Sequence, residues 1–397
     1  MMEKAPSELT MWEDVSPTGT LKMTDEQINE KYTSGEQRIV TESNREKLPN
    51  FIDALRKSRY MELRPFYQRR PRWDPAKRSK LIESFIMNVP VPPVFLYEID
   101  YNRYEVMDGQ QRISAIHDFY DNKYKLIGLD KWPEINGKTY STLPSKIRAG
   151  IDRRSISYIL LLKESAIDEE DALAIRQLIF ERLNTGGVEL EAQEIRNCLY
   201  QGMFNDLLHK LSQNVIFRSA WKIPAYRQEE DDSPSRELCN STLYSKMEDV
   251  ELILRFYALR HHEHFRKGMR GFLDLYMIKS LTFSMDDIIF LRNLFESTIT
   301  LAYNLYGNYL FRPFNPNKGI WENRPHKTFY DAVMVSLSEH LDAARTLEDK
   351  SSAIIEETQE LFRINPPGTF TGRANTKIDI ENRIDKYASM LRRVIGS

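Results

Sequence analysis

The first half of the chain combines helical and strand-like hydrophobic patterns. Asp74-Pro75 is typical of a helix start, and apolar residues then recur on one face of a predicted helix of about fourteen residues. The proline-bounded apolar run over residues 94–99 predicts a strand, residues 100–102 a tight turn, and residues 103–107 the returning strand. A helix followed by a hairpin is therefore expected in this part of the chain.

A short polar motif, DGQQR at residues 108–112, follows the second predicted strand, and helical spacing resumes directly after it. The apolar run over residues 155–163 predicts a further buried strand. Asp168 is placed to cap another helix, which ends at the glycine pair of residues 186–187. Helices and strands are thus interspersed, which predicts a mixed α and β domain.

Beyond residue 190 the strand signals fade and helical periodicity takes over, so the second half predicts an all-α domain. The predicted helices cover residues 191–212, 245–267, 284–305, 328–346, 351–363 and 376–394. Ser245 with Glu248, and Ser284 with Asp287, have the spacing of capping boxes or near variants of them. The fold class predicted for the whole chain is therefore α+β.

Length and composition fit this division. A chain of 397 residues with 41% hydrophobic and 29% charged residues suits a globular protein of two or three domains. We expect a polar arm over residues 1–35, an α+β domain over 36–200 and an α-helical domain over 201–397. Two cysteines cannot form a disulfide framework, and the polar start lacks a signal peptide, so a cytoplasmic protein without a membrane partner is expected.

The net charge of −2 conceals a strongly basic segment. Residues 56–80 carry ten Lys and Arg against two acidic residues, a net charge of +8, with aromatic residues interleaved. This composition is typical of a surface that contacts nucleic-acid phosphates, and the alternative is a solvated basic face. Arg69, Arg72 and Lys77 are the candidate DNA contacts, whereas Trp73 is expected to pack in the core.

The DGQQR motif has the chemistry of a phosphate site. Gly109 lets the backbone approach a ligand closely, and the helix that follows directs unpaired amides and the positive end of its dipole at an anion. Arg112 adds a charge-assisted contact, and the amides of Gln110 and Gln111 can hydrogen-bond to a phosphate or a base. The alternative is a structural turn in which Asp108 caps the helix and pairs with Arg112.

A third motif, FERLNTGG at residues 180–187, is followed by QEIRN at residues 193–197. Taken singly, these segments have ordinary explanations. Asn184 is a residue type that tolerates the left-handed conformation at a helix end, and the pair Glu194 and Arg196 is typical of a solvated helix face. Their order along the chain is more informative.

The order QxRxxWD at residues 68–74, then DGQQR, then FERLNTGG with QEIRN resembles the N-terminal domain of GmrSD-type modification-dependent restriction enzymes, itself similar to the ParB and sulfiredoxin superfamily. The resemblance covers about residues 36–200. It implies a ParB/sulfiredoxin-like domain in a stand-alone member without the HNH nuclease domain. It also implies DNA as a partner in prokaryotic or phage defence, a possible partner protein and a possible oligomer.

The resemblance further implies a site for a nucleoside triphosphate and magnesium. The implied nucleotide contacts are Gln68, Arg70, Asp108, Gly109, Gln110 and Arg112. Asn184 aligns with the asparagine of the magnesium-binding motif, and Glu181 is placed to replace the acid that this sequence lacks. Arg112, Gln111 and Glu181 would act in hydrolysis, which needs positioning and charge stabilisation rather than a covalent nucleophile.

Three functions are therefore expected in turn. The first is a DNA-interacting protein that binds and hydrolyses a nucleoside triphosphate. The second is a non-enzymatic DNA-binding or specificity subunit, because Gln110 and Gln111 replace the glutamate and arginine of the ParB motif. The third is a nuclease with an unrecognised site near His261 and His264, although the pattern places both histidines at an exposed helix end.

Overall fold

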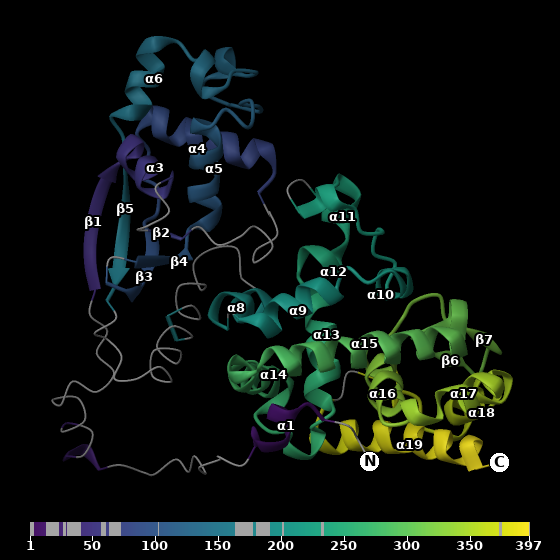
Figure 1. The fold of residues 1–397 in the computed structure, drawn as a ribbon. Helices are drawn as coiled ribbons and strands as arrows, with labels where there is room; N and C mark the ends of the chain where they lie inside the picture. Colours follow the sequence, from purple (N-terminus) through teal and green to yellow (C-terminus); the bar gives the residue numbers. More distant parts are fainter. Residues whose placement is uncertain are drawn as a thin grey trace. The chain divides into compact units, whose positions relative to one another are not determined.

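The chain folds into two compact units in the computed structural model (Figure 1). One unit is Gly19–Leu190, and the other combines Met1–Thr18 with Glu191–Ser397. The division at Leu190 precedes the expected one at residue 200, and the first residues of the chain belong with the helical unit. The structure describes residues 4–12, 24–26, 29, 41–56, 61–62, 73–101, 103–162, 178–179, 191–200, 202–231, 234–372 and 375–396.

The unit Gly19–Leu190 contains a mixed sheet with helices packed against it. Its described elements are β1 (Thr41–Lys47), α3 (Leu48–Arg56), β2 (Met61–Glu62), α4 (Pro75–Met87), β3 (Val94–Asp100), β4 (Arg103–Asp108), α5 (Gln110–Tyr120), α6 (Ser145–Asp152) and β5 (Ser155–Leu161). The strand order is β1-β5-β3-β4-β2. The β3–β4 and β1–β5 pairs are antiparallel, whereas β3–β5 and β2–β4 are parallel.

The helix and hairpin predicted in this unit are confirmed. Asp74 Oδ1 accepts a hydrogen bond from the Lys77 amide at 2.8 Å, and helix α4 ends at Asn88 in the left-handed conformation. The hairpin of β3 and β4 follows, as the alternation of the sequence predicts. Residues from α3, α4 and α5 form one core with the sheet, including Phe51, Ile82, Phe85, Val94, Ile113 and Ile116.

The second unit is almost entirely helical. Its described helices are α1 (Pro6–Thr10), α8 (Ala192–Leu199), α9 (Met203–Leu211), α10 (Val215–Ala220), α11 (Arg236–Asn240), α12 (Thr242–Ser245), α13 (Glu248–Leu259), α14 (Gly268–Lys279), α15 (Met285–Tyr306), α16 (Lys327–Ser338), α17 (Ala344–Asp349), α18 (Ser351–Ile364) and α19 (Lys377–Gly396). A small hairpin pairs β6 (Phe314–Asn315) with β7 (Ile320–Trp321). Within the described residues, no helix is both long and apolar enough to cross a membrane.

Of the two capping boxes predicted in this unit, one is confirmed. Ser284 Oγ accepts the Asp287 amide at 3.2 Å, and the Asp287 carboxylate accepts the Ser284 amide at 2.7 Å, so α15 begins where predicted. The other prediction is wrong, because α13 is capped by Met247 in the left-handed conformation and Ser245 ends the preceding short helix. Helix α13 therefore begins after a separate turn.

The first described residues of the chain pack into the helical unit through a buried carboxylate. Glu8 of α1 is fully buried, and its Oε1 accepts hydrogen bonds from Tyr276 Oη at 2.7 Å and His261 Nε2 at 3.0 Å. Arg260 Nη1 lies 3.1 Å from both carboxylate oxygens. Trp12 Nε1 donates to His261 Nδ1 at 3.0 Å. Because an indole N–H only donates, His261 is neutral and carries its proton on Nε2.

This packing shifts both titrations of the pair. Burial opposes ionisation of Glu8, but Arg260 and the hydrogen bond from His261 outweigh it and lower the pKa of Glu8 to about 2. Burial lowers the pKa of His261 below 6.5, although the hydrogen bond from Glu8 opposes that change. The unfolded chain therefore binds more protons at His261 below pH 6.5 and at Glu8 below pH 4.5.

Consequently, the free energy of unfolding of the helical unit is expected to fall as the pH drops below about 6.5, and to fall further as Glu8 becomes protonated. Urea denaturation followed between pH 8 and pH 4 would measure this dependence. His261→Gln removes one of the two titrations and should flatten the profile above pH 5. An unchanged profile in His261→Gln would show that His261 is not the group responsible.

Candidate functional site

The DGQQR motif forms the turn between β4 and α5, as predicted. Asp108 is the last residue of β4, Gly109 is the N-cap of α5, and α5 begins at Gln110. Gly109 has a φ of 96°, and a Cβ atom at this position would lie 2.4 Å from Val94 Cγ1 of the neighbouring strand. Both the backbone conformation and the close contact with β3 therefore require glycine.

One guanidinium closes this turn. Arg112 Nη2 donates to Asp108 Oδ2 at 2.7 Å and to the Pro93 carbonyl at 3.1 Å. The Arg112 side chain remains 17% exposed, and its Nε has no hydrogen-bond partner within the described part of the chain. The turn thus contains an arginine that is held in place and retains a donor for a further acceptor.

The structural alternative for this motif is present in part. Asp108 pairs with Arg112 as that alternative expects, but Asp108 does not cap the helix, and no side chain caps α5. Because the first amides of a helix have no partner within it, the start of α5 retains hydrogen-bond donors for an anion. Gln110 is buried, whereas Gln111 is partly exposed beside this helix end.

Several predicted site residues lie outside the described residues. These are Gln68, Arg69, Arg70, Arg72, Glu181 and Asn184. Lys77 is described and is exposed on α4, where its Nζ lies 5.1 Å from the centre of the Trp73 ring. Trp73 packs against the core of the unit, as expected for it. The nucleotide, magnesium and DNA contacts assigned to these residues stay predictions.

The QEIRN segment is not the solvated face that its charges suggest. It lies on α8 of the helical unit, and Glu194 and Arg196 are buried, as are Gln193 and Asn197. Arg196 Nε donates to Asp274 Oδ1 at 2.7 Å, and its Nη1 donates to Glu251 Oε2 at 2.8 Å. This arginine joins α8 to α13 and α14, and partners so distant along the chain cannot be identified from local charge spacing.

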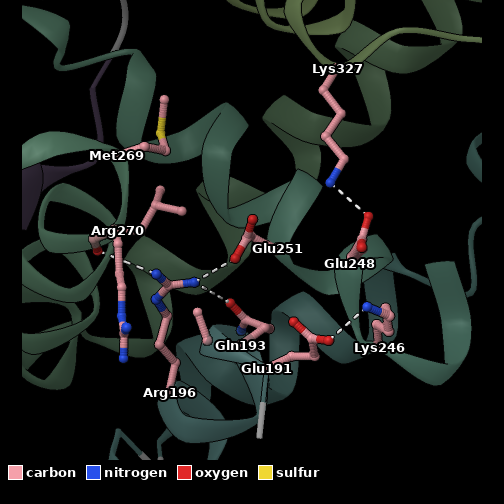
Figure 2. Close-up of a pocket in the computed structure, with 11 residues that line it drawn as sticks. Glu191, Gln193, Arg196, Lys246, Glu248, Glu251, Met269, Arg270 and Lys327 are labelled. Atoms are coloured by element: carbon pink, nitrogen blue, oxygen red, sulfur yellow. Dashed lines mark hydrogen bonds and ion pairs between the residues drawn. The ribbon is translucent and has the colours of Figure 1, made fainter. Parts of the chain in front are cut away.

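Arg196 also forms part of a polar pocket of about 310 Å³ in the helical unit (Figure 2). Lys246 and Lys327 stand on its wall and pair with Glu191 at 2.8 Å and Glu248 at 2.6 Å. The sequence did not predict this pocket, because its lining comes from helices widely separated along the chain. Its charged walls are paired with one another, which makes the pocket a weaker candidate than the DGQQR turn for a phosphate.

The histidines of the nuclease alternative do not form a metal site. No group of three or more His, Cys, Asp or Glu side chains suited to a metal ion occurs among the described residues. His261 is buried by Glu8 and Trp12, so the exposed helix end predicted for it is wrong. His264 stacks on Trp12 with ring centres 4.8 Å apart. The geometry therefore gives the nuclease alternative no support at these positions.

Comparison with known families locates the DGQQR turn within a defined domain. The family model described as GmrSD restriction endonuclease, N-terminal domain, matches residues 48–201. No curated protein and no solved structure matches the chain. The match begins at α3, includes the DGQQR turn and ends after α8, as the order of the sequence motifs indicates. Through residues 48–201, the chain belongs to the family of proteins with a GmrSD-type N-terminal domain.

Proposed function

We propose that this protein binds and hydrolyses a nucleoside triphosphate and interacts with DNA in a restriction-type defence system. The family name, which refers to a restriction endonuclease, supports the DNA and defence parts of the proposal. The observation that carries the nucleotide part is the glycine turn at Gly109. There, an uncapped helix start and a partly exposed arginine stand side by side.

The chemistry of this turn suits a polyphosphate. The amides at the start of α5 and the positive end of its dipole would hydrogen-bond to phosphate oxygens. Arg112 would contribute a charge-assisted hydrogen bond, and Gln111 would orient the group that is attacked. Gly109 has no Cβ, which permits the close approach that such a contact needs. A ParB/sulfiredoxin-like arrangement of Gln68 and Arg70 around the same phosphates belongs to this proposal.

Magnesium would accompany the nucleotide. Mg²⁺ keeps several water ligands and shares phosphate oxygens, so it needs few protein groups. Asn184 would provide an amide oxygen, and Glu181 would act in place of the missing acid of the motif. Asp108 is the described carboxylate at the turn, and its pairing with Arg112 keeps that arginine oriented.

Replacing Arg112 with alanine tests this assignment. Loss of a charge-assisted hydrogen bond is expected to weaken nucleotide binding about 10- to 100-fold, and phosphate release should fall with it. Phosphate release from ATP, GTP, CTP and UTP would be measured with and without DNA. Arg153→Ala, which removes an exposed arginine of the same unit, is the matched control and should leave both quantities unchanged.

Unfolding midpoints measured in parallel separate binding from folding, because Arg112 also bonds to Asp108 and the Pro93 carbonyl. Unchanged nucleotide binding in a folded Arg112→Ala protein would contradict the proposal. These same structural bonds favour the second candidate, a non-enzymatic DNA-binding or specificity subunit. Absence of turnover by the natural protein with every nucleotide, alone and with DNA, would select that candidate.

A further inference from the structure

A second basic segment lies directly after α5. Residues 122–154 carry eight Lys and Arg against three acidic residues, a net charge of +5. Residues 122–144, here called the lobe, include two short 3-10 helices at Pro133–Ile135 and Tyr140–Thr142. The lobe is closed on itself, because the Leu126 amide donates to the Lys138 carbonyl at 2.9 Å and the Gly137 amide returns to Leu126 at 2.7 Å.

The lobe is fastened along helix α4, which carries the predicted DNA contact Lys77 (Figure 1). Glu83 of α4 is buried, and its Oε1 accepts the backbone amides of Lys131 at 2.7 Å and Trp132 at 2.9 Å. Ser79 Oγ accepts the Ile127 amide at 3.0 Å. A buried carboxylate therefore fixes the backbone of the lobe, so its side chains keep a defined position beside α4.

This arrangement brings together exposed cations from two distant segments. Lys77 and Lys80 of α4 are exposed, as are Lys125 and Lys131 of the lobe. Lys80 forms an ion pair with Asp130 at 2.9 Å, which links the two segments at the surface. We call these four lysines, together with Trp132, the α4–lobe surface.

An exposed indole stands among these lysines. Trp132 is 37% exposed, although its backbone is held by the buried Glu83 carboxylate. A solvated basic face needs charge alone, whereas a fixed, exposed aromatic ring beside ammonium groups is the combination that binds single-stranded nucleic acid. There, bases stack on the ring while cations contact the phosphates.

We propose that the α4–lobe surface binds DNA, with its lysines on the phosphates and Trp132 stacked on an unpaired base. The inference rests on the proposed DNA interaction and extends it to a part of the chain that the basic segment of residues 56–80 does not contain. It also sets a preference: single-stranded DNA, or duplex DNA with an unpaired base, binds better than a perfect duplex at this surface.

Fluorescence anisotropy with labelled single-stranded and duplex DNA of one sequence, titrated at several salt concentrations, tests the proposal. Replacing Lys77, Lys125 and Lys131 by alanine should reduce the slope of log affinity against log salt by about 0.7 for each phosphate contact to single-stranded DNA. A matched control replaces Lys47, Lys210 and Lys318, which are exposed elsewhere on the chain. That variant should keep the natural slope.

The stacking contact has its own readout. Trp132→Ala should weaken single-stranded DNA binding about 5- to 150-fold and duplex binding much less, whereas Trp132→Phe should restore part of the loss. If the natural protein binds DNA while the triple-lysine and Trp132→Ala variants bind it equally well, the surface is overturned and the DNA interaction stands. If the natural protein binds no DNA even at low salt, the proposed function fails together with the surface.

Discussion

Replacing Glu8 with alanine is expected to lower the free energy of unfolding of the helical unit by about 3–5 kcal/mol. The Glu8 carboxylate is the shared acceptor of Arg260, His261 and Tyr276, all of which are fully buried. Without it, the Arg260 charge stays in the interior without this counter-ion, and the cost of desolvation is no longer offset. The effect is large because one substitution removes the partner of three groups.

Leu9→Ala provides the matched control on the same helix, since Leu9 is 65% exposed and its loss should change stability by no more than about 0.5 kcal/mol. Denaturation in guanidinium chloride would compare the two variants. Amide hydrogen exchange would show whether α1 detaches before the remaining helices unfold. Equal stability of Glu8→Ala and Leu9→Ala would contradict the role assigned to the buried carboxylate.

Gly109→Ala is expected to destabilise the Gly19–Leu190 unit by about 2–5 kcal/mol. The left-handed conformation costs an alanine about 1–2 kcal/mol, and forcing a methyl group against Val94 adds about 1–3 kcal/mol. The contact that produces the second contribution is the 2.4 Å approach to Val94 Cγ1. Nucleotide binding should be lost with the turn.

Gly137→Ala separates these two contributions. Gly137 also has a positive φ, 83°, but a Cβ atom there would meet nothing within 4 Å. This variant should therefore lose only about 1–2 kcal/mol and keep its nucleotide affinity. Thermal unfolding followed together with nucleotide binding would compare the pair. Equal losses in both variants would show that the packing against Val94 does not matter.

Much of the first unit could be predicted because its signals are local. Asp74-Pro75 determines where α4 begins, since the cap and the proline act within one helical turn. The alternation over residues 94–107 predicts β3 and β4, and the motif that follows opens α5 as expected. In the second unit the Ser284 capping box sets the start of α15 in the same way.

The remaining features depend on partners far apart along the chain. Glu8 lies more than 250 residues from Arg260 and His261, so nothing near either segment indicates that they meet. Arg196 has the local pattern of a surface charge, yet its carboxylate partners come from α13 and α14. Likewise, β1 is largely exposed and carries no strong strand signal, and its pairing with β5 supplies its hydrogen bonds.

An experimental structure with a non-hydrolysable nucleoside triphosphate would test the central claim most directly. Phosphate oxygens are predicted to lie within hydrogen-bond distance of the amides at the start of α5, with the Arg112 guanidinium turned toward them. A nucleotide bound elsewhere, for example in the pocket beside Arg196, with Arg112 still held by Asp108 and Pro93, would contradict it.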